Sequence, residues 1–159
     1  MKRKEAFFNI DLEGLERLES LLEQLPIKLQ RKALRSSLQH GTEIVKEEAR
    51  RNCPKRKPAH GWMAFVEDLD QPSLHDNIVS KVTVSKTRAW GRVGIDYKKV
   101  RHGHLVEFGT EPHRQKKLGI QHPGARKRPF MRPAVDNKGE EAANVMANEL
   151  YDAVIEGLK

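Results

Sequence analysis

Histidines supply the clearest candidate chemical groups in this chain. His102 and His104 are separated by one residue, so on a strand both imidazoles would point to the same side and could share a divalent metal. A third ligand would have to come from Glu107, His113 or His122, the nearest suitable residues in the sequence. Exposed or hydrogen-bonded histidines are the competing interpretation, and we favour it because the spacing matches no established metal motif.

The same two histidines suggest a second candidate activity, a small metal-dependent nuclease. In such an enzyme a histidine activates a water molecule against a phosphodiester, and a helix packed on two strands returns further ligands to the metal. The last predicted helix of this chain contains no histidine. We therefore keep the nuclease as the alternative and predict no catalytic residue, no metal ligand and no cofactor.

Cys53 is the only cysteine, so the chain can form no internal disulfide, which fits a reducing compartment. Its neighbours Arg50, Arg51 and Lys55 are basic and could lower the pKa of the thiol, which would make it reactive. No histidine nearer than His60 is available to activate it. A cysteine that is simply tolerated at the end of a helix is the competing interpretation.

Positive charge is the strongest compositional feature. The chain has 30 Lys and Arg against 22 Asp and Glu, a formal net charge of +8. Between Glu111 and Asp136 there is no acidic residue, while Arg114, Lys116, Lys117, Arg126, Lys127, Arg128 and Arg132 are all basic. Such a loop can neutralise phosphates, but Phe130 is its single aromatic ring, which disfavours base stacking. We expect a salt-sensitive contact with a nucleic-acid backbone or with an acidic protein face.

Length and composition limit the class of protein. A chain of 159 residues has the size of one domain, and we predict a single domain over 1–159 with extended loops at 55–72 and 111–128. No run approaches the roughly 18 apolar residues of a membrane span. The basic start is followed by Glu5 and Asp11 rather than an apolar signal core, so we expect synthesis in the cytoplasm and no membrane contact.

Three helices are predicted from apolar periodicity. Leucines at 12, 15, 18, 21, 22 and 25 indicate a first helix over 11–25. Pro26 either ends it or opens a second helix, which we expect over 27–51. The basic side chains of that helix pair with the acidic first helix or point into solvent, and they are Lys28, Arg31, Lys32 and Arg35. A last helix is expected from about 136 to 157.

The strands are predicted from β-branched runs. Residues 78–84 and 89–95 are expected to form an antiparallel hairpin, in which Gly91 and Gly94 leave room for another backbone or a bulge. Residues 105–108 could form a strand or one helical turn. Trp62 and Phe65 in the loop at 55–72 indicate a lid or a partner surface. The predicted fold class is α+β: two N-terminal helices, a small mainly antiparallel sheet with a hairpin, and a long C-terminal helix packed on the sheet.

Several motifs connect the chain to a family. They are Leu105-Val106-Glu107-Phe108-Gly109-Thr110, His122-Pro123-Gly124 and Pro129-Phe130-Met131-Arg132-Pro133-Ala134. In this order they resemble the small neck or tail-completion proteins of long-tailed phages, which are also labelled minor tail or head–tail joining proteins. The leucine helix and the segments 49–54 and 73–78 follow the same family order, so the resemblance covers nearly the whole chain.

The resemblance implies a non-enzymatic structural component of a phage or prophage virion. Copies of the chain are expected to form a homo-oligomeric ring at the head–tail junction, closed by head-to-tail contacts, with six copies as one option. The implied partners are adjoining neck and tail proteins, with non-specific contact to DNA as a secondary expectation. The implied location is the virion, and the host cytoplasm during assembly.

The motif residues have physical roles that suit assembly. Candidate assembly residues are Glu107, Phe108, Gly109, Thr110, His122, Pro123, Gly124, Pro129, Phe130, Arg132 and Pro133, together with the basic loop. Gly109 permits a turn with positive φ, and Pro123-Gly124 is expected to form a tight turn. The two prolines around Phe130 should stiffen the chain before the last helix. Glu107 and Arg132 either form a buried or interface ion pair or are simply exposed.

Overall fold

The computed structural model describes residues 15–55, 73–86, 88–115 and 119–159. The elements in chain order are α1 (Leu15–Glu23), α2 (Ile27–Asn52), the 3-10 helix η2 (His75–Asn77), β1 (Ile78–Val84), β2 (Ala89–Ile95), α3 (Gly103–Phe108), β3 (His113–Gln115), β4 (Ile120–His122) and α4 (Met131–Gly157). The predicted α+β class is confirmed. The expected first turn of the first helix and the loop carrying Trp62 and Phe65 lie outside the described residues.

Helix α2 has the bounds that its sequence predicts. Pro26 precedes it with φ −55°, so the fixed proline dihedral opens the helix. Pro54 ends it, because a residue before proline favours extended backbone, and Cys53 has φ −63° and ψ 127°. The four basic side chains predicted for its outer face, at 28, 31, 32 and 35, are exposed.

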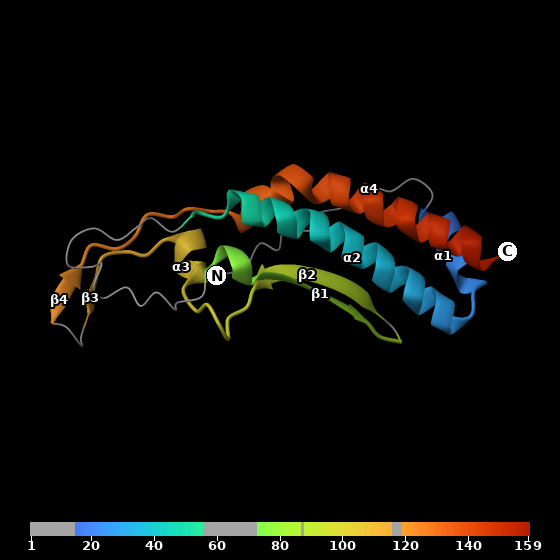
Figure 1. The fold of residues 1–159 in the computed structure, drawn as a ribbon, viewed down its shortest axis with the longest axis horizontal. Helices are drawn as coiled ribbons and strands as arrows, with labels where there is room; N and C mark the ends of the chain where they lie inside the picture. The colour runs from blue at the N-terminus through green and yellow to red at the C-terminus, as the bar shows by residue number, and fades with distance from the viewer. Residues whose placement is uncertain (1–14, 56–72, 87, 116–118) are drawn as a thin grey trace.

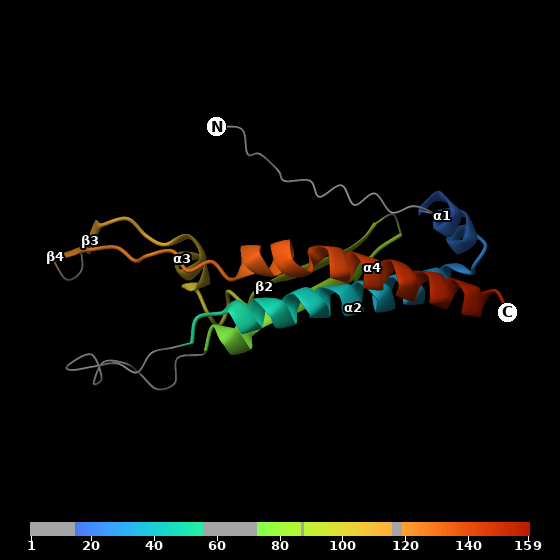
Figure 2. The same cartoon turned by 90° about the horizontal axis from the view of Figure 1, so that it is seen from above.

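The helices α2 and α4 form one layer and the β1–β2 hairpin forms the other (Figures 1 and 2). The hairpin is antiparallel, with a register that runs from Ile78 opposite Ile95 to Val84 opposite Ala89. Its inner face meets α2 closely at Gly91, where an added Cβ would lie 2.5 Å from Thr42 Cγ2. The prediction that Gly91 leaves room for another backbone is confirmed, since the Leu38 carbonyl oxygen of α2 would lie 3.7 Å from that Cβ, whereas a Cβ on Gly94 would meet no described atom within 4 Å.

The main buried cluster lies where the end of α2, the start of β1 and the start of α4 meet. Its members are Ala49, Cys53, Leu74, Ile78, Val100, Phe130 and Ala134. Phe130 and Ile78 have no exposed surface. Arg50 joins two of these elements, since its Nη2 donates a hydrogen bond of 3.2 Å to the carbonyl of Ile78. Burial of these side chains fixes the hairpin against α2 and brings the first turn of α4 to the same cluster.

Small residues line the contact between α2 and α4, which is the most extensive between any two elements. Buried members are Ala33, Ser37, Gly41, Ala142 and Ala143. A Cβ on Gly41 would lie 2.3 Å from Met146 Cγ and 3.0 Å from the Ala142 carbonyl oxygen. Because Gly41 has no side chain, that of Met146 packs directly against the backbone of α2 and the two helices can approach closely.

Helix α4 begins at Met131, five residues before the predicted start near Asp136. Pro133 suggests that the helix starts after it, and this expectation is wrong. Proline is tolerated in the first turn of a helix because the N–H that it lacks would have no partner there. The helix is 27 residues long. Among the helices that the structure describes, none combines the length and apolar character needed to cross a bilayer.

The stretch at 111–128, predicted as an extended loop, contains a small ribbon instead. Strands β3 and β4 pair antiparallel, with His113 opposite His122, and Thr110 bridges to Ala125 nearer the body. This ribbon, which we call the arm (residues 110–115 and 119–125), projects from the end of the molecule opposite the C-terminus (Figure 1). Mutual backbone pairing gives the stretch a regular structure despite its weak periodicity.

The α2–α4 contact generates a stability prediction. Replacing Gly41 by Leu should lower the free energy of unfolding by about 1–3 kcal/mol, because the new side chain overpacks the interface. Urea denaturation followed by circular dichroism measures this. Gly139→Ala in α4 is the matched control: its Cβ meets only Val135 Cγ1 at 3.7 Å, so the change should raise stability by about 0.5–1 kcal/mol. Equal effects of the two changes would contradict the packing described.

Candidate functional site

Glu107 holds the beginning of α4. Helix α3 directs this residue inward, where its side chain is only 8% exposed. Oε2 accepts hydrogen bonds from the backbone N–H groups of Phe130 (2.8 Å) and Met131 (3.0 Å), and Oε1 accepts one from that of Arg132 (3.1 Å). No side chain of the helix itself caps this end. A carboxylate at a helix N-terminus satisfies free amides and interacts favourably with the helix dipole, so Glu107 caps α4 from another element.

The hypothesis of a buried ion pair between Glu107 and Arg132 is wrong within the chain, and an interface pair with another copy stays a prediction. The side chain of Arg132 is 82% exposed, and its Nε lies 3.8 Å from Asp136. The buried carboxylate of Glu107 is already satisfied by three backbone donors, which are fixed in place by the helix. A guanidinium would have to lose its hydration to compete with them, and this costs free energy.

Two glycines bring backbones together at the base of the arm. Gly109 has φ +72°, as predicted, and an added Cβ would lie 2.7 Å from the carbonyl oxygen of Ala125. Gly124 has φ +84°, and its Cβ would lie 2.4 Å from the carbonyl oxygen of Thr110. The tight turn predicted at Pro123-Gly124 is not formed in the described structure. The backbone continues past these residues to Ala125, which pairs antiparallel with Thr110. Both glycines therefore serve close approach of the two sides of the arm.

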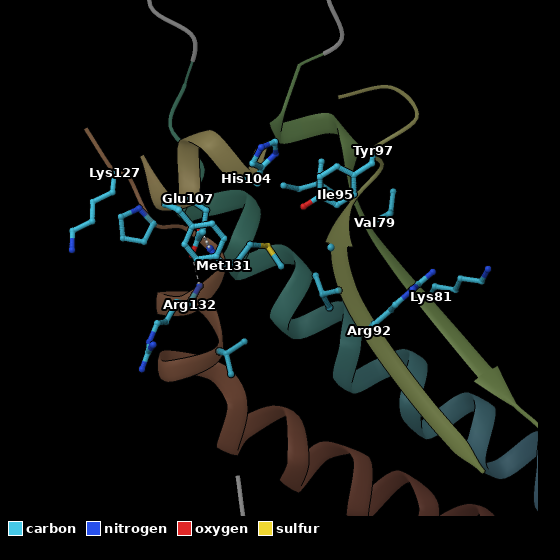
Figure 3. A pocket seen from close by; sticks show the side chains of 15 residues that line it. Val79, Lys81, Arg92, Ile95, Tyr97, His104, Glu107, Lys127, Met131 and Arg132 are labelled. Carbon is cyan, nitrogen blue, oxygen red and sulfur yellow. Dashed lines mark hydrogen bonds between the residues drawn. The ribbon is translucent and has the colours of Figure 1, made fainter. Parts of the chain in front are cut away.

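A groove of about 1,070 Å³ lies between β2, α3 and the start of α4 (Figure 3). Its apolar lining comes from all three elements and from β1, and consists of Val79, Val93, Ile95, Phe108, Met131 and Val135. Cationic side chains also line it, from the hairpin, the arm base and α4: Lys81, Arg92, Lys127 and Arg132. Phe108 is 77% exposed, which leaves a large apolar ring open to solvent. The groove thus offers apolar surface surrounded by positive charge.

The remaining motif residues are spread over the core, the groove, the start of α4 and the arm. Phe130 is in the core, while Pro129 is exposed and lines the groove, and Pro133 is in the first turn of α4. Strand β4 ends at His122, and the exposed Pro123 follows it. Exposed basic side chains at the arm and its base are Arg114, Arg126, Lys127 and Arg128. Lys116 and Lys117 lie outside the described residues.

The histidine pair does not have the strand geometry that the metal hypothesis assumed. His102 directly precedes α3 and His104 lies in its first turn. The ring of His104 faces that of Tyr97, with centroids 6.4 Å apart. In the part of the chain that the structure describes, no three His, Cys, Asp or Glu side chains gather in a metal-binding arrangement.

Cys53 is a buried thiol and not the exposed, reactive one that its basic neighbours suggested. It is 5% exposed and belongs to the main buried cluster. Burial raises the pKa of this thiol, and the nearby carboxylate of Asp76 raises it further. The hypothesis that basic neighbours lower the pKa is therefore wrong, because desolvation of the thiolate dominates.

Sequence reasoning missed the hairpin's contribution to the groove. Val79 and Arg92 lie on the hairpin face turned away from α2, and Tyr97 follows the hairpin. The available signal was the alternation of β2, in which Trp90 and Arg92 occupy the positions between the inward residues. Arg92 also lies over the Trp90 ring, 5.5 Å from its centroid, which keeps two large side chains together on this face.

The cap generates a prediction that separates it from the ion pair. Glu107→Ala should lower the free energy of unfolding by about 2–3 kcal/mol, because three amides at the start of α4 lose a charged acceptor. Arg132→Ala should change it by less than about 0.5 kcal/mol, since that side chain is exposed. Chemical denaturation of both variants measures the difference. Similar losses in the two would show that the side-chain pair, and not the cap, stabilises the helix.

The buried thiol generates a second prediction. Iodoacetamide at neutral pH should label Cys53 at least about a hundredfold more slowly in the folded protein than in urea, because the reagent needs an exposed thiolate. The matched control is Lys55→Cys in a Cys53→Ala background, which places a thiol on exposed backbone two residues away. Labelling of Cys53 as fast as that of the control would contradict its burial.

Comparison with known proteins agrees with the resemblance seen in the motifs. The model of the HK97-gp10-like family, described as "Bacteriophage HK97-gp10, putative tail-component", matches residues 15–109. This span takes in Glu107 and Gly109, and the two later motifs lie beyond it. No curated protein and no solved structure gives a significant match. Since the matched span is more than half of the 159 residues, the chain belongs to the HK97-gp10-like family of bacteriophage tail components.

Proposed function

We propose that this protein is a non-enzymatic structural component that completes the phage tail at its junction with the head. In this role copies of the chain form a ring, and the ring contacts adjoining neck and tail proteins in the virion. Membership of a tail-component family supports the structural class. The observation that carries the finer proposal is the projecting arm beside a groove whose apolar side chains, Phe108 above all, are open to solvent.

The character of the groove favours a macromolecular partner. Phe108, Tyr97 and Val79 are 77%, 55% and 42% exposed, which together make a large apolar surface next to exposed cations. Contiguous apolar surface of this kind usually marks a protein interface. The exposed basic residues at the base of the arm would add long-range attraction for an acidic partner, and DNA passing through a ring would meet the same charge.

Deletion of the gene in the phage that encodes it tests the proposal. We expect cells to accumulate DNA-filled heads and separate tails, with few joined infectious particles, and expression of the chain from a plasmid to restore joining. Electron microscopy and plaque counts measure both. Formation of normal particles without the gene would contradict the proposal. So would cleavage of DNA by the purified protein in the presence of a divalent metal, if the variant His102→Ala lost this activity.

The basic arm base gives a finer prediction. Replacing Arg126, Lys127 and Arg128 by Ala should reduce the yield of joined particles by about tenfold and leave DNA packaging in heads unchanged, because the charge serves a protein contact. Replacing Lys28, Arg31 and Arg35 by Ala removes equal charge from an exposed face of α2 and is the control. An equal loss of packaged DNA and of joining would point to DNA as the partner instead.

A further inference from the structure

The two ends of the molecule carry different exposed surfaces. The end away from the groove includes the last two turns of α4, where Tyr151, Ile155 and Leu158 share one side at the spacing i, i+4 and i+7. Tyr151 is 44% and Leu158 42% exposed. Asp152 and Glu156 flank them and are also exposed. We call this the tail face of α4.

The tail face carries two carboxylates, Asp152 and Glu156, that form no ion pair among the described residues, and Lys159 follows the helix. The last turn of α4 contains no basic residue, so the negative end of the helix dipole is unopposed within the helix by any side-chain cation. Asp152 and Glu156 add two carboxylates next to it. An amphipathic helix with apolar residues at i, i+4 and i+7 is the form that docks into apolar grooves of other proteins.

The groove has complementary properties. Its apolar lining is accompanied by Lys81, Arg92, Lys127 and Arg132, which come from separate elements around it (Figure 3). Its one carboxylate, that of Glu107, is engaged by three backbone amides at the start of α4. Of the four cations only Arg132 has a carboxylate partner within the described residues, the exposed Asp136 at 3.8 Å. An apolar helix end flanked by acids therefore suits this groove in both polarity and charge.

The same chain cannot supply this helix end to its own groove. Helix α4 has 27 residues and so spans about 40 Å, with its first turn lining the groove and its last turn at the far end (Figure 1). A straight helix keeps its two ends apart. The occupant must then come from a second copy, and a contact between two different faces of identical chains generates a ring or a filament.

We infer that the tail face of α4 from one copy docks in the groove of the next copy. Tyr151, Ile155 and Leu158 contact the apolar lining, while Asp152 and Glu156 face the cations. This inference rests on the proposed ring and assigns the pair of surfaces that joins its neighbouring subunits.

Cysteine cross-linking in assembled particles tests the contact. The variant Cys53→Ala, Val79→Cys, Tyr151→Cys places one thiol in the groove and one on the tail face, both on exposed positions. Under mild oxidation, non-reducing electrophoresis of purified particles should show a ladder of linked chains. The matched control exchanges Tyr151→Cys for Glu43→Cys, which lies on an exposed part of α2, and should give no ladder. Particles that contain the chain but give no ladder with the first variant would overturn the inference.

Charge reversal provides a second, independent test. Lys81→Glu with Arg92→Glu should reduce joined particles by about tenfold, and so should Asp152→Lys with Glu156→Lys, because each places like charges together. All four residues are exposed, so thermal unfolding should change little. Combining the four changes should restore joining. Failure of the combination to restore it, with each pair still harmful, would show that another protein occupies the groove.

The outcomes separate the contact from the proposed function. If particles join normally without the chain, the function is wrong whatever the cross-links show. If the chain is required and present in joined particles, yet neither the ladder nor the restored joining is seen, the function stands and the docking of α4 is wrong.

Discussion

The rest of the structure depends on one buried carboxylate. Glu107 belongs to a helix of six residues, but its three hydrogen bonds fix the first turn of the 27-residue α4. Through that turn it positions Phe130 in the core and Met131 in the groove. Glu107 thus connects the short helix α3 to the long helix α4.

The scaffold and the exposed surfaces follow different physical rules. Helices α2 and α4 approach through small residues such as Gly41 and Ala142, where close packing leaves little freedom. At the arm base, the two positive-φ glycines allow backbone to lie on backbone, so the direction of the arm is set where it leaves α3. The closely packed helices thus carry exposed apolar side chains at both ends, Phe108 at one and Tyr151 at the other.

Much of this fold could be predicted from local periodicity. The features that depend on contacts between residues far apart in the sequence could not. The β-branched run at Ile78 and the spacing of α2 are local signals, and the structure follows both. The cap escaped prediction because its donors are backbone amides 23 to 25 residues away, which every sequence possesses, whereas the charge of Arg132 was visible and misleading. The start of α4 was also mispredicted, because Pro133 is usually a sign that a helix has not yet begun. In the first turn, however, no intrahelical bond needs the N–H that proline lacks. The groove could not be predicted because it exists only when the hairpin, α3 and the start of α4 are placed together.

The length of α4 sets more than the span of the molecule. Each residue of an α-helix advances about 1.5 Å and turns about 100°, so α4 fixes both the distance and the angle between the groove at its first turn and Tyr151 near its last. One residue inserted after Ala143 would rotate the side chains of Tyr151 and Leu158 by about 100° around the helix axis relative to the groove. The contact of α4 with α2 would have to rearrange along the helix to accommodate the insertion. The residue count of α4 therefore specifies the relative position and direction of these two exposed surfaces.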